Sequence, residues 1–192
     1  YPDIKNVALL SDNSYGGLSL LSKFREVMKS NFFQMKTIEL DGRKLTASEI
    51  RKKIDSLPEK TIVLLGTWRV DKNCNFYQPK DASKLFRNRP DIPTFTPTSL
   101  LIKDIAIGGW VPNYRDSNKD FLKQILTQIS DSCIDTTYIK IGNHYELNAK
   151  MLRKFKIDKK LIPKKASFAP TNLSKNVYLH IIFIFVFNFY FG

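Results

Sequence analysis

The residues best suited to bind a ligand lie in loops that follow short apolar runs. The first of these loops, Asp12–Gly17, reads DNSYGG and follows the run Asn6–Ser11. Backbone N–H groups at the start of a helix can hold an anion or another polar ligand group. The loop has neither the GxGxxG nor the Walker A pattern, so nucleotide binding has little support. Two interpretations stay open: Ser14 and Tyr15 contact a small molecule, or the loop is a tight turn capped by Asp, Asn or Ser.

A second candidate loop follows the apolar run Thr61–Gly66 and begins with Thr67 and Trp68. A tryptophan at the end of a strand can stack on a ligand, while Asp71 can pair with its polar groups. The alternative is that Trp68 only covers the edge of a sheet. We predict Thr67, Trp68 and Asp71 as ligand-binding residues.

Two further loops, Thr96–Ser99 and Gly108–Tyr114, supply the remaining candidates, Thr98 and Trp110. Paired glycines before Trp110 allow a close approach of the backbone or a positive φ angle. A plain turn is the competing interpretation. If all these loops follow parallel strands, Ser14, Tyr15, Thr67 and Trp68 should line one concave face.

Catalytic and metal sites are not indicated. His144 has no neighbouring Ser or Cys in the sequence with which it would form a nucleophile and base pair. The two cysteines, Cys74 and Cys133, form no CxxC motif, and the spacing of the two histidines is not that of a metal site. We therefore predict no catalytic residue, no metal and no cofactor.

Charge widens the range of partners without selecting one. The chain has 31 basic and 18 acidic residues, a net charge of +13. This excess permits nucleic acid, an anionic membrane or an acidic ligand. The basic residues between Lys150 and Lys165 are interpreted as the solvated face of a helix. Because no aromatic stacking pattern accompanies them, nucleic acid is not predicted as a partner.

Apolar periodicity predicts alternating strands and helices. Strands are expected at 6–11, 36–40, 61–66, 93–96, 105–107 and 138–141, and helices at 18–30, 46–57, 81–89, 118–129 and 147–155. Thr46 and Glu49 fit a capping box at the start of the second helix. Strands that alternate with helices over short connections predict an α/β fold, with a mostly parallel, Rossmann-like sheet and helices on both faces.

The end of the chain differs in character. Val177–Phe191 is an apolar run of 15 residues, shorter than the ~20 needed for a membrane-spanning helix. It is either the start of such a helix or an aromatic segment packed on another surface. We divide the chain into an α/β ligand-binding region, 1–170, and a polar hinge with an apolar tail, 171–192.

The order of several segments resembles the periplasmic substrate-binding protein family of ABC systems. The similarity is strongest to the form used as the extracytoplasmic sensor domain of Bacteroides-type sensor histidine kinases. The matching segments are Val7–Gly17, Thr61–Asp71, Ile92–Ser99, Ala106–Tyr114 and Tyr145–Phe168. They lie within residues 4–168.

This resemblance implies part of a two-lobed domain with a ligand cleft between its lobes. It also implies a non-catalytic sensor, in which a small molecule closes the lobes and the membrane segment transmits the change. The expected location is the periplasmic face of the bacterial cytoplasmic membrane, with the membrane contacted through the C-terminal segment and a homodimer as a candidate assembly. Two alternatives remain: the substrate-binding component of an ABC transporter, and a small α/β enzyme.

Overall fold

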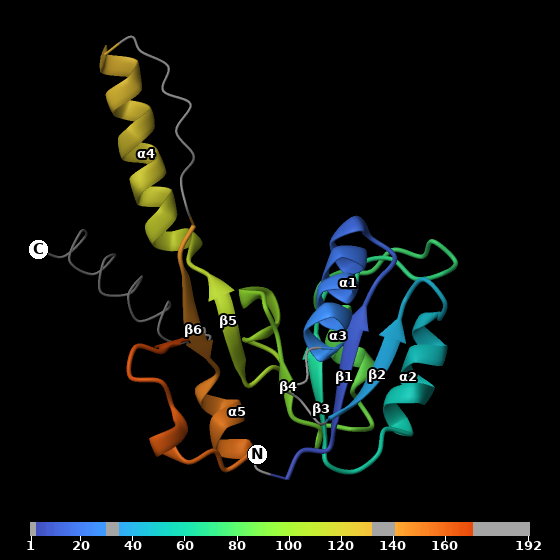
Figure 1. Ribbon diagram of the computed structural model, residues 1–192. Coiled ribbons are helices and arrows are strands. Elements are labelled where there is room, and N and C mark those ends of the chain that lie inside the picture. The colour runs from blue at the N-terminus through green and yellow to red at the C-terminus, as the bar shows by residue number, and fades with distance from the viewer. Residues whose placement is uncertain (1–2, 30–34, 132–140, 171–192) are drawn as a thin grey trace, which may run out of the picture.

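The computed structural model of the chain describes residues 3–29, 35–131 and 141–170. Strands and helices alternate along most of this length (Figure 1). The strands are β1 (Asn6–Ser11), β2 (Lys36–Asp41), β3 (Thr61–Leu65), β4 (Thr94–Phe95), β5 (Gly108–Pro112), β6 (Asn143–Leu147) and β7 (Ser167–Phe168). The helices are α1 (Tyr15–Lys29), α2 (Ala47–Asp55), α3 (Asp81–Leu85), α4 (Tyr114–Asp131) and α5 (Ala149–Lys154), with short 3-10 turns η1 (Ser99–Leu101) and η2 (Lys159–Leu161).

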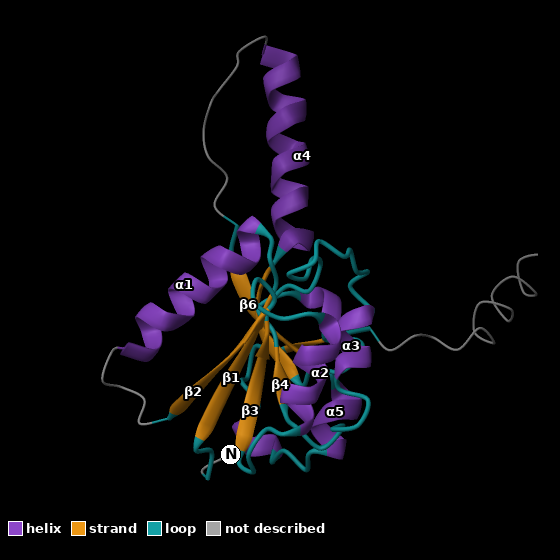
Figure 2. Cartoon of the chain, turned by 90° about the vertical axis from the view of Figure 1, so that its right-hand side faces the viewer, coloured by secondary structure: helices purple, strands orange, loops and turns teal. Residues whose placement is uncertain are grey.

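All seven strands form one sheet in the order β2-β1-β3-β4-β5-β6-β7. Pairing is parallel from β2 through β5, β6 runs antiparallel to β5, and β7 runs parallel to β6. Helix α1 lies on one side of the sheet, and α2 and α3 lie on the other (Figure 2). The predicted α/β class, with a mostly parallel sheet and helices on both faces, is confirmed.

Strand β1 forms the centre of the core because both of its faces are covered. Leu9 packs with Leu21 and Phe24 of α1, whereas Leu10 on the opposite face belongs to the cluster that includes Ile50 of α2. All six residues of β1 are buried. A strand covered on both faces needs a continuous apolar run rather than an alternating one.

Helix α2 begins with the capping box that the sequence predicts. The Thr46 hydroxyl accepts a hydrogen bond from the Glu49 amide at 3.3 Å, and the Glu49 carboxylate accepts one from the Thr46 amide at 2.7 Å. The two bonds satisfy amides that have no partner within the helix. Glu49 also forms an ion pair with Lys72 at 2.7 Å, which joins α2 to the loop after β3.

One predicted strand is wrong. The segment 105–107 is not a strand; β5 begins at Gly108 and contains both glycines. Glycine usually weakens a strand, but here it permits a close approach between strands. A Cβ atom on Gly109 would lie 1.7 Å from the carbonyl oxygen of Thr96, so β4 and β5 can pack side by side only if this residue has no side chain.

Most of the second half departs from the predicted boundaries. Residues 138–140 lie outside the described residues, and Ile141 precedes β6 rather than ending a strand. Leu147 ends β6, and the Asn148 side chain then caps α5 by accepting hydrogen bonds from the amides of Lys150 and Met151 at 3.0 and 3.2 Å. The predicted helix from 147 to 155 is therefore shorter than expected.

Helix α4 extends away from the sheet (Figures 1 and 2). The sequence predicts an amphipathic helix here, and the helix is present, but Phe121, Leu122 and Leu126 are 50 %, 58 % and 64 % exposed. No helix among the described residues is long and apolar enough to span a membrane. The predicted hinge and apolar tail, 171–192, lie outside the described residues.

Candidate functional site

A single buried carboxylate organises the loops at the ends of β1 and β3. The Asp12 side chain accepts hydrogen bonds from the Ser14 amide at 3.1 Å, the Thr67 hydroxyl at 2.9 Å and the Arg69 amide at 2.6 Å. It also accepts one from the Ser14 hydroxyl, which in turn accepts one from the Gly17 amide at 3.1 Å and thereby caps α1. The structure thus brings the predicted residues Ser14 and Thr67 together through Asp12.

Tyr15 and Trp68 have very different surroundings. Tyr15, the first residue of α1, is 89 % exposed, whereas Trp68 is 3 % exposed. The Trp68 ring packs against Tyr77, with 5.3 Å between ring centroids. Both residues follow the carboxyl ends of neighbouring parallel strands, β1 and β3, but Trp68 is buried and Tyr15 is exposed. Ligand contact by either residue stays a prediction.

Asp71 is also enclosed by protein. It has no exposed surface, and it accepts hydrogen bonds from the Asn73 amide at 2.9 Å, the Asn75 amide at 3.1 Å and the Tyr77 hydroxyl at 2.8 Å. Burial raises the pKa of the Asp71 carboxyl, but these hydrogen bonds together outweigh burial and hold the pKa below its ordinary value. Burial first, and then the bond to Asp71, raise the pKa of Tyr77 to about 12. Asp71 therefore orders the loop after β3.

Thr98 shares a small cavity with Thr67 and Trp68 at the end of β3. Its volume is about 50 Å³, enough for little more than one water molecule. The backbone amide of Thr98 donates to the Thr96 hydroxyl at 3.2 Å, which fixes the start of η1. Three of the predicted residues are thus neighbours around this small cavity.

A much larger cavity, of about 500 Å³, lies over the middle strands of the sheet. Its floor is a transverse row of residues in register on four strands: Leu64, Phe95, Gly108 and Leu147. Gly108 has no side chain, and the Leu147 side chain packs over it: a Cβ atom on Gly108 would lie 2.5 Å from Leu147 Cδ2. Leu64 also packs against the α1 cluster, which places this cavity on the same sheet face as α1.

An aromatic pair stands at one side of this apolar cavity. Trp110 and Tyr145 face each other across β5 and β6, with ring centroids 4.4 Å apart and planes inclined by 59°. They are 52 % and 42 % exposed, so both rings have surface available for a ligand. Trp110 is the one predicted site residue in this cavity.

The opposite wall comes from α5 and the segment after it. Leu152, Ile157, Leu161, Ile162 and Pro163 line the cavity from this side. Lys156 has a φ angle of 51°, in the left-handed region, which ends α5 and turns the chain toward Ile157. The turn lets the segment fold back beside β6.

The lining determines what this cavity can do chemically. Apart from the hydroxyls of Thr96 and Tyr145, its side chains are apolar or are the indole of Trp110, and no carboxylate, imidazole, ammonium or thiol of the described residues lines it. Among the described His, Cys, Asp and Glu side chains, no group of three or more gathers as metal ligands. Such a lining suits the binding of an apolar or aromatic molecule.

Sequence reasoning missed Phe95, Tyr145 and Leu152 as parts of this cavity. Only one signal could have indicated Tyr145: an aromatic residue in a short strand often lies opposite another aromatic in the neighbouring strand. That signal requires the pairing of β5 with β6, which joins residues more than 30 positions apart in the sequence.

Comparisons with known proteins bear on the fold. No protein-family model and no curated protein matches this sequence significantly. Among solved structures, an ABC domain in complex with L-Trp from Streptococcus pneumonia aligns with a TM-score of 0.60 and 10 % identity, over 87 % of this chain and 57 % of that one. A conserved domain protein from Vibrio cholerae aligns with a TM-score of 0.54 and 15 % identity, over 88 % of this chain and 56 % of that one.

These likenesses show that the chain shares its α/β fold with the two structures. The chain spans little more than half the length of either structure. At identities of 10 % and 15 %, the shared feature is the arrangement of strands and helices.

Proposed function

We propose that this chain is a ligand-binding domain that holds the apolar or aromatic part of a small molecule beside Trp110 and Tyr145. The observation that carries this proposal is the apolar cavity of about 500 Å³ with two half-exposed aromatic rings at its side. Its volume lies within the range of roughly 300–1,000 Å³ that is common for small-molecule sites. Its mostly apolar lining with few polar groups is also typical of such sites.

The position of the cavity supports the same proposal. Ligands of open α/β sheets bind near the carboxyl ends of the parallel strands, and this cavity reaches the end of β4 at Thr96 and Pro97. The structure from Streptococcus pneumonia is described as an ABC domain in complex with L-Trp, a small molecule with an aromatic ring. Ser14, Tyr15, Thr67 and Thr98 stay predicted as a second set of contacts at the ends of β1, β3 and β4.

For the biological role, we propose an extracytoplasmic sensor domain of a bacterial sensor histidine kinase, at the periplasmic face of the cytoplasmic membrane. The support is the order of segments quoted above and the apolar run Val177–Phe191, which would contact the membrane. Ligand binding would shift a two-state element, and a homodimer would pass that shift on. The second candidate is the substrate-binding component of an ABC transporter, which the ABC domain among the structural neighbours favours.

Ligand-induced thermal stabilisation tests the binding proposal. A panel of aromatic amino acids, indoles, phenols and short-chain acids should contain compounds that raise the melting temperature of the full chain, because a ligand that binds only the folded state stabilises it. Trp110→Ala should weaken the binding of such compounds by about fivefold or more, since a stacked aromatic residue contributes on the order of 1 kcal/mol beyond its buried area.

The matched control is Phe76→Ala, which removes an aromatic ring that is 83 % exposed and does not line the cavity. This variant should bind as tightly as the unaltered chain. Equal weakening in both variants, or no stabilising compound in the panel, would contradict the proposed site.

Sensor and transporter roles differ in what the gene encodes after this segment. A histidine kinase domain in the same reading frame after residue 192 would support the sensor role. A complete reading frame without a kinase, next to genes for an ABC permease and ATPase, would support the transporter role instead.

A further inference from the structure

A second cavity lies on the opposite face of β5 and β6 from the apolar one. Side chains alternate along a strand, so Tyr145 and Leu147 face the apolar cavity while His144 and Glu146 face the other side. This second cavity has a volume of about 590 Å³, and its lining is far more polar. It does not belong to the site described above.

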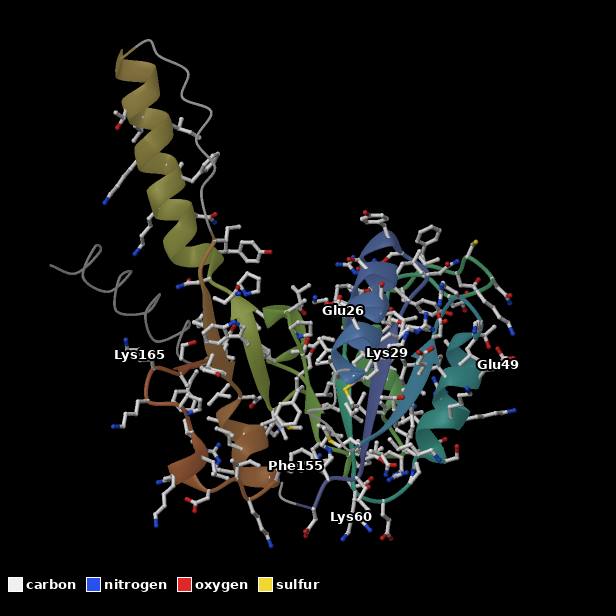
Figure 3. The ribbon with its side chains drawn as sticks, viewed as in Figure 1. Glu26, Lys29, Glu49, Lys60, Phe155 and Lys165 are labelled. Atoms are coloured by element: carbon white, nitrogen blue, oxygen red, sulfur yellow. The ribbon has the colours of Figure 1, made fainter. Side chains whose placement is uncertain are left out.

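Two lysines from separate segments flank this polar cavity. Lys103 follows η1, and Lys165 lies on the loop before β7, beside β6 (Figure 3). Neither ammonium forms an ion pair with a described residue. The hydroxyls of Ser99 and Ser167 lie in the same lining. The cavity therefore offers two cations and two hydroxyls to an acidic ligand group.

His144 adds a hydrogen-bond donor to these groups. Its Nδ1 atom is enclosed and has no hydrogen-bond partner among the described residues. In the neutral ring, a proton on Nδ1 would be a buried donor without an acceptor, and such a donor costs free energy. We therefore assign the proton of the neutral ring to Nε2, which leaves Nε2 as the ring nitrogen that can donate to a ligand.

Glu146 supplies the opposite charge. Its side chain belongs to a residue only 9 % exposed, yet it pairs with no described cation. Buried charges are normally paired or hydrogen-bonded, because removing a carboxylate from water is costly. A ligand that brings an ammonium or hydroxyl donor to Glu146 would satisfy this carboxylate.

We propose that this cavity, lined by Lys103, His144, Glu146 and Lys165, binds a small organic acid that also carries an amino or hydroxyl group. The acid group, a carboxylate or a phosphate, lies between the two lysines and accepts from His144 Nε2. The donor group of the same molecule contacts Glu146. This site is independent of the apolar cavity and goes beyond the proposed function.

Isothermal titration of the full chain with four probes tests this proposal. O-phosphoethanolamine and 4-aminobutyrate each combine an acid group with an ammonium, and they separate the phosphate from the carboxylate. Inorganic phosphate and ethylamine each supply only one half. At least one of the two bifunctional probes should bind at least tenfold more tightly than inorganic phosphate or ethylamine. Each of these single-function probes leaves one set of charged protein groups without its partner.

Charge-removing variants locate the binding. Lys165→Ala and Glu146→Gln should each weaken the bifunctional probe by about tenfold or more, the size expected for losing a hydrogen bond between charged groups. Lys164→Ala is the matched control, since Lys164 is an exposed neighbour that does not line the cavity. Circular dichroism verifies that each variant is folded. If Glu146→Gln does not fold, Lys165→Ala still tests the site, because it alters only an exposed side chain.

Three results would overturn the proposal: no binding by either bifunctional probe, equal binding by inorganic phosphate alone, or equal weakening by Lys164→Ala and Lys165→Ala. Trp110→Ala should leave the titration unchanged. Failure of the polar site is therefore distinguishable from failure of the apolar one.

Discussion

Asp12 shows how one residue can fix a whole edge of the sheet. It is fully buried, and its partners come from the loop after β1 and the loop after β3. A buried carboxylate is stabilising only where hydrogen bonds replace the water that it loses. Here the bonds join two strands' ends, so the conformations of both loops depend on a single side chain.

Replacing this carboxylate should therefore destabilise the fold. We expect Asp12→Ala to lower the free energy of unfolding by about 2–4 kcal/mol, because it leaves two amides and two hydroxyls without their acceptor. Urea denaturation measures the change. Asp104→Ala, at an exposed position without a side-chain hydrogen bond in the described part, should change stability by less than about 0.5 kcal/mol. Equal losses in the two variants would contradict this role of Asp12.

Glu49 links stability to pH. The hydrogen bond from Lys72, followed by those from Thr46, lowers the pKa of the Glu49 carboxyl to about 2. A lowered folded-state pKa means that the stabilisation is present above the unfolded-state pKa, near 4.3, and is lost as the pH falls toward 2. The pKa of Asp41 is also lowered, since its bonds with Arg43 outweigh the effect of burial, and it contributes in the same direction.

We expect urea denaturation to show falling stability between about pH 4.5 and pH 2. Glu49→Gln should be less stable than the unaltered chain at pH 7, and this difference should shrink as the pH approaches 2, where Glu49 itself becomes protonated. A difference that stays constant over this pH range would show that Glu49 acts without its charge.

At the scale of elements, the contact between β4 and β5 depends on Gly109. Strand β4 has only two residues, and the Thr96 amide after it donates to the Gly108 carbonyl at 3.1 Å. A Cβ atom on Gly109 would meet the Thr96 carbonyl oxygen at 1.7 Å, and that oxygen belongs to the backbone and cannot rotate away. The absence of a side chain thus keeps β4 and β5 in register.

Gly109→Ala should lower the free energy of unfolding by about 2–3 kcal/mol, in the range for forcing extra atoms into a packed site. Gly142→Ala is the matched control, because a Cβ atom there would meet nothing within 4 Å. Thermal unfolding of both variants measures the effect. Similar melting temperatures for the two variants would mean that β4 and β5 separate at little cost.

The same elements show what the sequence could and could not predict. Strands β1 and β3 and helix α2 were predictable because their apolar periods and the Thr46 cap are local signals. The position of β5 was predicted wrongly because paired glycines are locally typical of a turn. The reason for glycine in this strand, the close approach of the Thr96 carbonyl, is visible only in the structure. Contacts between distant segments leave no such local signal.

The candidate site was predictable to a smaller extent, for the same reason. Trp110 could be singled out as an aromatic residue after paired glycines, but its partner Tyr145 depends on a pairing of distant strands. Trp68 and Asp71 were expected to face a ligand because they follow a strand. In the structure both side chains are buried: the Trp68 ring packs against Tyr77, and Asp71 accepts a hydrogen bond from the Tyr77 hydroxyl.

At the scale of the whole molecule, one sheet carries two cavities of different chemistry on the two faces of β5 and β6. The apolar one is lined by aromatic and aliphatic side chains, and the polar one by lysines, His144 and Glu146. Helix α4 follows β5 and extends away from the sheet (Figure 1). Strand β6, which lies between β5 and the edge strand β7, contributes residues to both cavities.

A titration of the full chain with p-cresol, a small aromatic probe, followed by ¹H–¹⁵N NMR, tests whether an aromatic ligand binds in the apolar cavity. We predict saturable shifts in the backbone amides of Gly108 and Gly109 and in the indole N–H of Trp110. The indole N–H of the buried Trp68 and the amide of Gly16 in α1 should stay unchanged, because neither residue lines the apolar cavity. Shifts confined to Gly16 and Trp68, or no saturable shift at Trp110, would contradict the assignment of the ligand site to this cavity.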